Sequence, residues 1–202
     1  WLSARRTPFL TRWLNAAYMS LFFFYCLSLV ILFVQKRREM RVLVLSMLLA
    51  KLVGNTVHFA MPSLGDVYVA ERAHLYANMP EKPTVCFIQN ILWEDRMRLL
   101  RNPERYTPRN PFTGIAAFPS LHCALFAVMI LVAWRCHRWL LPLYVPVGIL
   151  MSISTLYFGW HYISDCVAGV LLGAGAVYAS YRLLDWEDAL EQRWFTTAEQ
   201  KT

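Results

Sequence analysis

Residues 13–34 read WLNAAYMSLFFFYCLSLVILFV, a stretch of 22 residues without a formally charged side chain. At a rise of about 1.5 Å per residue, a helix of this length crosses the roughly 30 Å hydrocarbon core of a bilayer. The sequence therefore predicts a transmembrane helix over 13–34, and this helix decides the class of the fold.

The composition of the whole chain agrees with a membrane protein. Its 202 residues are 57% hydrophobic and 16% charged, whereas soluble domains contain about 25% charged residues. Too few polar side chains are available to cover a globule in water. The length allows five or six membrane helices and leaves no room for a second catalytic domain. We expect a single integral membrane domain over residues 1–202.

Four further apolar segments have the length of a helix: 42–61, 120–134, 139–157 and 161–181. The basic stretches 35–41 and 135–138 are short loops between them, and the positive-inside rule places both on the cytoplasmic side. Arg5, Arg6 and Arg12 fall on the outer side in this scheme and argue against it. We predict an all-α, polytopic membrane helical bundle with five visible transmembrane helices. The odd number indicates a sixth before Trp1.

Residues 63–115 are too polar to cross a membrane, and the topology makes them a non-cytoplasmic loop. Apolar residues recur within this loop at roughly helical spacing: Val85, Phe87, Ile88, Ile91, Leu92, Leu99 and Leu100. This pattern predicts an amphipathic helix lying on the membrane surface. A helix packed against its own domain fits the pattern equally well.

The net charge of +7 does not indicate a nucleic-acid-binding protein. The basic residues flank apolar segments or lie in one loop, a distribution that fits membrane orientation and an anionic substrate. The five cysteines are scattered and form neither a metal-binding spacing nor a disulfide framework. The expected partners are therefore the lipid bilayer and an anionic substrate, without nucleic acid.

Two histidines distant in sequence fall at the same membrane face. His122 ends the stretch FPSLH at the outer start of one apolar segment, and His161 lies in GWHYISD at the outer start of another. His161 and Asp165 are four residues apart, so on a helix the carboxylate can bond one imidazole nitrogen and leave the other free to attack. An acid at the start of an apolar segment is costly unless it has such a partner.

The residues before His122 suit an anion-binding helix start. Pro119 fits the first turn of a helix, and Ser120 is suited to cap that helix or to bind an anion. One oriented histidine, a second histidine as proton donor, and backbone amides can together transfer a phosphoryl group without metal. Interfacial histidines without a catalytic role are the common alternative. A metal site made by the histidines and Asp165 is less favoured, because no supporting residues are evident.

The two motifs resemble the second and third signatures of the type 2 phosphatidic acid phosphatase superfamily. His161-Tyr162-Ile163-Ser164-Asp165 follows His122 by 39 positions, and the likeness in helix order and outer loop extends from about Val42 to Arg182. The resemblance implies that His161 attacks phosphorus, with Asp165 orienting it. It also implies that His122 protonates the leaving oxygen and that Ser120 helps to hold the phosphoryl group.

Three departures from the phosphatase pattern point to one branch of that superfamily. The first signature, a lysine, six residues and Arg-Pro, is absent, and its nearest equivalent is Lys51, six residues and His58-Phe59. Thr155 stands where the third signature usually has an arginine, and Ser-Leu-His replaces Ser-Gly-His. These features resemble inositol phosphorylceramide synthases and sphingomyelin synthases, which move a phospho-headgroup between lipids.

Other residues must then compensate the charge of the phosphate. Arg105 and Arg109 precede the helix that starts at Ser120, and a guanidinium suits bidentate phosphate binding. Lys51 lies about halfway along a predicted spanning helix, a position that favours function. We predict that these three residues bind substrate, with His58 as a further candidate. Headgroup-facing arginines and a snorkelling lysine are the alternatives.

We therefore expect a membrane-embedded lipid phosphotransferase or phosphohydrolase that forms a phosphohistidine and needs neither cofactor nor metal. Its substrate is a phospholipid or lipid phosphate, and the resemblance favours headgroup transfer of the inositol phosphorylceramide synthase type. A simple phosphatase for phosphatidate or polyprenyl pyrophosphate and a non-enzymatic transporter on the same scaffold are the alternatives. The predicted topology puts the site on the non-cytoplasmic face, in a bacterial inner membrane rather than a Golgi membrane.

Overall fold

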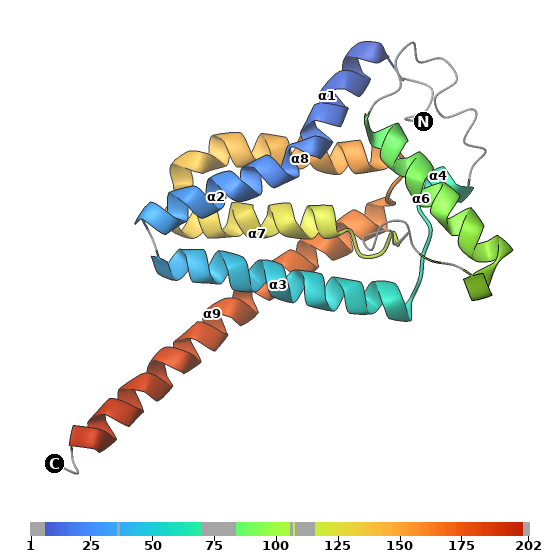
Figure 1. The fold of residues 1–202 in the computed structure, drawn as a ribbon. Coiled ribbons are helices and arrows are strands. Elements are labelled where there is room, and N and C mark those ends of the chain that lie inside the picture. The colour runs from blue at the N-terminus through green and yellow to red at the C-terminus, as the bar shows by residue number, and fades with distance from the viewer. Residues whose placement is uncertain (1–6, 36, 70–83, 106, 108–115, 200–202) are drawn as a thin grey trace.

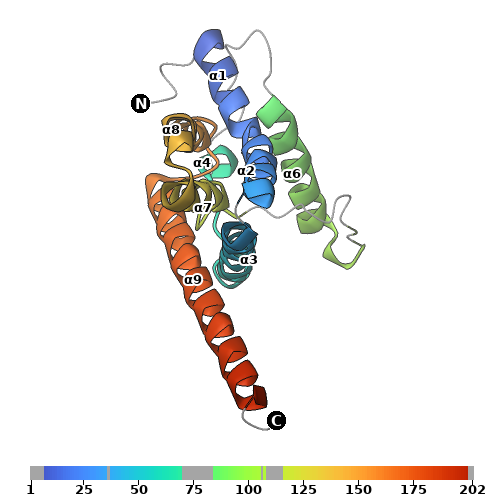
Figure 2. The ribbon, with the colours of Figure 1, turned by 90° about the vertical axis from the view of Figure 1, so that its left-hand side faces the viewer.

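In the computed structural model, the described residues are 7–35, 37–69, 84–105, 107 and 116–199. They form helices, and this part of the chain contains no strand. Four helices run alongside one another: α2 (Leu21–Gln35), α3 (Arg37–Ala60), α7 (Leu121–Cys136) and α8 (Leu141–Tyr157) (Figure 1). Helix α9 (Ile163–Glu199) crosses them obliquely and continues well beyond the bundle. The view along the bundle shows α7 in its middle (Figure 2). The all-helical prediction is confirmed.

Three of the described helical segments are long and apolar enough to cross a membrane: Arg38–Ala60, Arg138–Tyr157 and Ile163–Arg193. The bent pair α1 (Pro8–Met19) and α2 (Leu21–Gln35) makes a fourth if it acts as one span. Helix α7 (Leu121–Cys136) is apolar but has only 16 residues. The structure therefore supports three to four spans, and the number five stays a prediction.

The transmembrane helix predicted over 13–34 is divided into two helices, α1 and α2, which together are still long and apolar enough for one span. The chain bends by 41° between α1 and α2, at Ser20. The backbone N–H of Ser20 contacts the carbonyl oxygens of both Ala16 and Ala17, and its hydroxyl donates to Ala17 at 2.7 Å. These local hydrogen bonds tighten the last turn of α1, which is how serine competes with regular helix.

The basic stretch 35–41 is also not the loop that its charge predicts, because α3 (Arg37–Ala60) begins within it. The first turns of α3 pair with α9 (Ile163–Glu199). Arg38 lies 2.5 Å from Asp185, and Arg41 lies 2.5 Å from Glu187. These side chains are exposed, so each pair contributes little stability. Both partners on α9 lie beyond the predicted end at residue 181, because α9 continues to Glu199.

Helix α7 forms the centre of the bundle and packs against α2, α3, α8 (Leu141–Tyr157) and α9. Its buried side chains join the main core, with Phe126, Met129 and Val132 among them. Burial on several sides fits a helix with almost no amphipathic pattern. The central position of α7 fixes the place of its first turn, which carries His122.

Two glycines let α9 approach the start of α7 closely. A Cβ atom added to Gly169 would collide with the carbonyl oxygen of Ser120, and one added to Gly173 would collide with that of Ala124. The two glycines are four residues apart and lie on one face of α9, as in other close contacts between membrane helices. This contact brings the start of α7 against the start of α9, where the two histidine motifs lie.

Helix α6 (Thr84–Arg101) lies within the long polar segment, where the apolar spacing predicts a helix. Its Val85 is buried against Leu14, Tyr157 and Phe158, whereas Phe87 is 67% exposed. The Gln89 side chain donates to the carbonyl oxygen of Phe158 at 2.8 Å. Helix α6 therefore packs on the bundle through one face, and contact of its other face with a membrane surface stays a prediction.

Candidate functional site

Ser120 begins the helix that carries His122. It is the N-cap residue of α7, and its buried hydroxyl accepts a hydrogen bond from the N–H of Cys123 at 3.4 Å. Its own N–H donates to the carbonyl oxygen of Asp165 at 3.0 Å. The first-turn N–H groups of an α-helix have no acceptor within the helix, so this end of α7 favours an anion.

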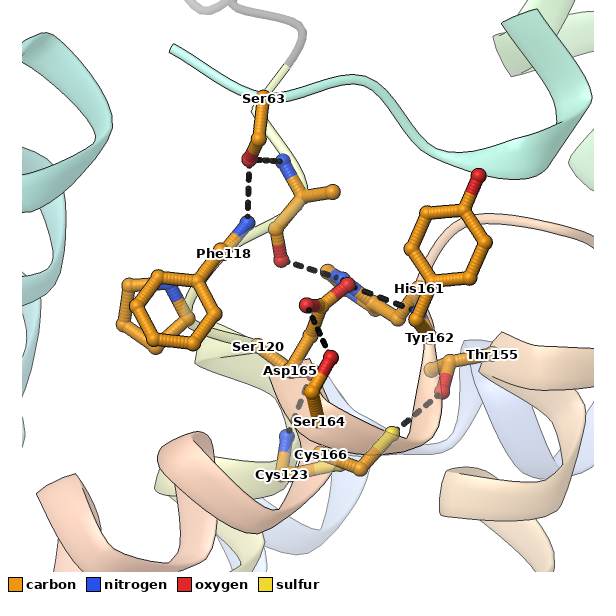
Figure 3. A network of polar contacts seen from close by, with 12 residues as sticks. Ser63, Phe118, Ser120, Cys123, Thr155, His161, Tyr162, Ser164, Asp165 and Cys166 are labelled. Carbon is orange, nitrogen blue, oxygen red and sulfur yellow. Dashed lines mark hydrogen bonds and ion pairs between the residues drawn. The ribbon is translucent and has the colours of Figure 1, made fainter. Parts of the chain in front are cut away.

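His161 lies in the connection between α8 and α9, before the first residue of α9. Gly159 has a positive φ of 72°, which L side chains rarely adopt, and allows the chain to turn there. The imidazole Nδ1 of His161 lies 2.7 Å from the carbonyl oxygen of Ala117 (Figure 3). A carbonyl oxygen only accepts, so Nδ1 carries the proton and Nε2 is the unprotonated nitrogen of the neutral ring.

Asp165 has a different set of hydrogen bonds from those expected. One of its carboxylate oxygens accepts the N–H of Tyr162 at 2.7 Å, which caps the start of α9, and the other accepts the hydroxyl of Ser164 at 3.2 Å. Its distance to Nδ1 of His161 is 3.8 Å. Because His161 precedes the helix, the two side chains do not share a helical face. Asp165 acts on the imidazole through its charge, and Ala117 provides the hydrogen bond.

His122 faces His161, with the two ring centroids 5.9 Å apart. The ring of Tyr18, from α1, packs on the His122 ring at a centroid distance of 4.7 Å. Tyr18 also stacks on Trp160 at 6.0 Å, with the ring planes 8° apart. The imidazole of His122 is thus oriented by an aromatic contact from a helix distant in sequence.

Aromatic residues from other elements extend this contact away from the histidines. Tyr68, in α4 (Asp66–Val69), stacks on Trp93 of α6 at 5.8 Å and meets Trp160 edge-on at 6.1 Å. Such offset and edge-to-face pairs are favourable beyond their buried area. Helices α1, α4 and α6 thereby enclose one side of the site.

Burial sets the protonation of His161. Loss of hydration lowers the pKa of its imidazole below the usual value, and the charge of His58 lowers this pKa further. The hydrogen bond to Ala117 and the charge of Asp165 raise the pKa but do not outweigh burial. His161 is therefore neutral at pH 7, which is the form that has a nucleophilic nitrogen.

The predicted substrate-binding residues separate into two groups. Ser120 lies with His122, His161 and Asp165. Lys51 is exposed on α3, seven residues and therefore about 10 Å before His58. Arg105 is exposed in the short helix Pro103–Arg105, beyond the end of α6. The prediction for Arg109 falls outside the described residues.

A metal site gains little support from the arrangement of donor atoms. Within the described ranges, no three side chains of His, Cys, Asp or Glu come together in a way that could hold a metal ion. Nδ1 of His161 is bonded to Ala117, and both carboxylate oxygens of Asp165 accept hydrogen bonds from their own helix start. These atoms are arranged to orient a histidine.

The structure also adds residues that the sequence did not indicate. Ala117 supplies the carbonyl oxygen for His161, and Ser63 accepts the N–H groups of Ala117 and Phe118 through its hydroxyl at 3.2 and 2.8 Å (Figure 3). A backbone carbonyl leaves no signal in the identity of its residue. Tyr18 lies inside a predicted spanning helix, where an aromatic residue is ordinary, so its contact with His122 was not predictable.

Comparison with family models supports the identity of these motifs. The model of the PAP2 superfamily matches residues 1–179, which include both histidine motifs and most of the bundle. Searches of curated proteins and of solved structures found no match. A family match over this much of the chain supports an enzyme with phosphatase- or phosphotransferase-type activity in general, since members of the family are generally phosphatases or phosphotransferases. The chain belongs to the PAP2 superfamily.

Proposed function

We propose that this protein transfers a phosphoryl group or phospho-headgroup from a membrane lipid through a phosphohistidine on His161. The observation that carries this proposal is the hydrogen bond from Nδ1 of His161 to Ala117. This bond leaves Nε2 unprotonated, beside His122 and the first turn of α7. The proposed site thus combines His161 as an oriented nucleophile, His122 as proton donor and the first turn of α7 as an anion-binding helix start.

In the first step, Nε2 of His161 attacks phosphorus and a P–N bond forms as the P–O bond to the leaving group breaks. This step needs His122 in its protonated form, which the negative charge of the bound phosphate would favour, and His122 then donates that proton to the leaving oxygen. In the second step, an acceptor hydroxyl attacks phosphorus, His122 takes the proton of that hydroxyl, and the P–N bond breaks. Both histidines thus return to their starting protonation.

The phosphoryl oxygens would lie at the start of α7, near Ser120 and the first-turn N–H groups. Asp165 would offset the positive charge that develops on His161 during attack. Lys51, Arg105 and Arg109 are proposed to supply positive charge for the rest of the headgroup. Of these, Lys51 lies on the same helix as His58, about two turns earlier along α3.

A hydrocarbon substrate fits the surroundings of the site. A groove of about 480 Å³ lies among α7, α8 and α9, and its lining is almost entirely apolar. Its lining includes Cys123 and Cys166, the residues that directly follow His122 and Asp165 in sequence. A groove with such a lining fits a hydrocarbon chain. We propose a phospholipid or lipid phosphate as the substrate.

The acceptor decides between transferase and phosphatase. The absent phosphatase first signature and Thr155 favour transfer to a second lipid or alcohol, as in the inositol phosphorylceramide synthase type. In the structure, the carbonyl oxygen of Thr155 accepts the N–H groups of Trp160 and His161 at 2.9 and 3.4 Å. Thr155 thus holds the connection between α8 and α9 that contains His161, instead of supplying a cation. Water as acceptor would give a lipid phosphate phosphatase through the same first step.

The test is an assay of purified protein on radiolabelled phosphatidic acid, phosphatidylinositol, phosphatidylcholine and polyprenyl pyrophosphate, with diacylglycerol and ceramide as acceptors. A new labelled lipid supports transfer, and free phosphate supports hydrolysis. His161→Ala should lower either product by at least about 100-fold. His137→Gln is the matched control, because His137 lies at the opposite end of α7.

Retained product formation in His161→Ala would contradict the proposal. Lipid movement across vesicle membranes without any chemical change, equal in wild type and His161→Ala, would support a transporter instead. We also propose that the site faces the non-cytoplasmic side of a bacterial inner membrane. A membrane-impermeant thiol reagent should then label Ser164→Cys, at the start of α9, from outside the cell.

A further inference from the structure

Residues 117–120, here called the strap, connect the polar segment to α7 and are held along their whole length. The carbonyl oxygen of Ala117 accepts Nδ1–H of His161 at 2.7 Å, and the N–H of Ser120 donates to Asp165 at 3.0 Å. The strap thus orients the proposed nucleophile at one end and begins the anion-binding helix at the other. A displacement of the strap would change both.

The opposite side of the strap is held by α3 and the residues that follow it. Ser63 accepts the N–H groups of Ala117 and Phe118 through its hydroxyl, and its carbonyl oxygen accepts Ala117 N–H at 3.1 Å. Nε2 of His58 lies 2.9 Å from the carbonyl oxygen of Pro119. Three consecutive strap residues are therefore bonded to α3 or its extension, as Figure 3 shows for Ser63.

The bond from His58 has a defined direction. A carbonyl oxygen is only an acceptor, so Nε2 of His58 must carry a proton and donate it to Pro119. This carbonyl precedes the N-cap residue Ser120 and therefore takes no part in the hydrogen bonds of α7. His58 is half-buried in the last turn of α3 and close enough to His161 for the two rings to interact electrostatically.

We propose that His58 is a positioning residue of the catalytic centre, which fixes the strap through Pro119 and thereby holds the Ala117 carbonyl against His161. This inference rests on the proposed function, because it assigns a role in the same reaction. His58 acts on the nucleophile through the strap and not by contact with the phosphoryl group. Ser63 serves the same purpose from the residues just after α3.

Substitution of His58 by amides of different length tests the hydrogen bond. The amide nitrogen of Gln reaches the place of Nε2, whereas that of Asn ends one bond short, and Leu has no donor. We expect His58→Gln to keep kcat within about threefold of wild type. His58→Leu and His58→Asn should lower kcat by about 10-fold to 100-fold with little change in KM, because small displacements of reacting groups are costly.

The readouts are turnover of fluorescent phosphatidic acid, phosphatidylinositol and phosphatidylcholine in detergent micelles, and hydrogen exchange of the peptide 116–122. Exchange at the strap amides should be faster in His58→Leu and His58→Asn than in wild type and His58→Gln. Ser63→Ala should show the same two changes, and Ser63→Thr, which keeps the hydroxyl, should show neither. The Ser63 pair tests the strap even where His58→Leu fails to fold.

Two results would overturn the inference. Equal activity of His58→Asn and His58→Gln would show that the bond to Pro119 has no role. A loss in His58→Gln as large as in His58→Leu, with weaker inhibition by orthovanadate, would show that His58 acts as a cation on the phosphoryl group. The parallel variant His161→Ala separates the proposed function from the positioning role of His58. If His161→Ala stays active, the proposed function fails. If His161→Ala is inactive while His58→Leu is active, only the positioning role of His58 fails.

Discussion

Nδ1 of His161 lies 2.7 Å from the carbonyl oxygen of Ala117, 44 residues earlier in the chain. Asp165, the residue whose spacing suggested the orienting role, lies 3.8 Å from the same nitrogen and caps the start of α9 instead. The backbone therefore fixes the tautomer of the proposed nucleophile, and the carboxylate adds negative charge beside it. Loss of the Asp165 carboxylate should therefore change the charge around His161, whereas displacement of the Ala117 carbonyl oxygen should change the orientation of its ring.

The pH dependence of the reaction follows from the burial of His161. Because its pKa is lowered, the neutral nucleophilic form persists as the pH falls below the usual histidine value of about 6.5. We expect the acid limb of kcat/KM to lie below about pH 6.5. The measurement is a pH profile of turnover with protein stability followed in parallel, and a limb above that pH would contradict the environment described for His161.

Asp165→Asn removes the charge near His161 but keeps a group that can accept the N–H of Tyr162. The charge of Asp165 raises the pKa of His161, so its loss should move the acid limb to lower pH. The plateau rate should fall by about 10-fold or more, since the charge that develops on the imidazole loses its partner. The control is Asp185→Asn, which removes a carboxylate from an exposed ion pair far along α9. An unchanged pH profile of turnover in Asp165→Asn would show that the Asp165 carboxylate serves only to cap α9.

Gly169→Ala should destabilise the protein, although alanine is the better helix former. The added Cβ would collide with the backbone carbonyl of Ser120, which cannot move without shifting α7. Gly175→Ala, on the same helix with nothing near the added atom, should be neutral or stabilising by about 0.5–1 kcal/mol. Thermal unfolding in detergent measures both, and equal unfolding temperatures would contradict the close packing of α9 on α7.

These contacts show how far the sequence predicts the molecule. Apolar length predicted the helices at 42–61, 120–134, 139–157 and 161–181, and the two motifs predicted that His122 and His161 lie together. The break at Ser20 was not predictable, because a single serine within an apolar stretch does not by itself indicate where a helix ends. The strap contacts were missed because they join backbone groups, which every residue has, to side chains 44 to 61 positions away.

A role for His122 as proton donor should depend on the leaving group. p-Nitrophenol is a good leaving group that needs little protonation, whereas an alkyl alcohol needs a proton as the P–O bond breaks. His122→Gln should therefore lower turnover of phospholipids by about 100-fold to 10,000-fold and that of p-nitrophenyl phosphate far less. His161→Ala should lower both, and an equal loss on both substrates in His122→Gln would assign His122 to another role.

The central claim is a covalent intermediate on His161, and the direct test is to trap it. Wild-type protein is mixed for milliseconds with a lipid labelled in the transferred phosphorus, then denatured in base, and the label is located by peptide mass spectrometry. The account predicts phosphate or phospho-headgroup on the peptide that contains His161, stable in base and labile in acid, and absent from His161→Ala. Label on another residue, or equal labelling of wild type and His161→Ala, would contradict it.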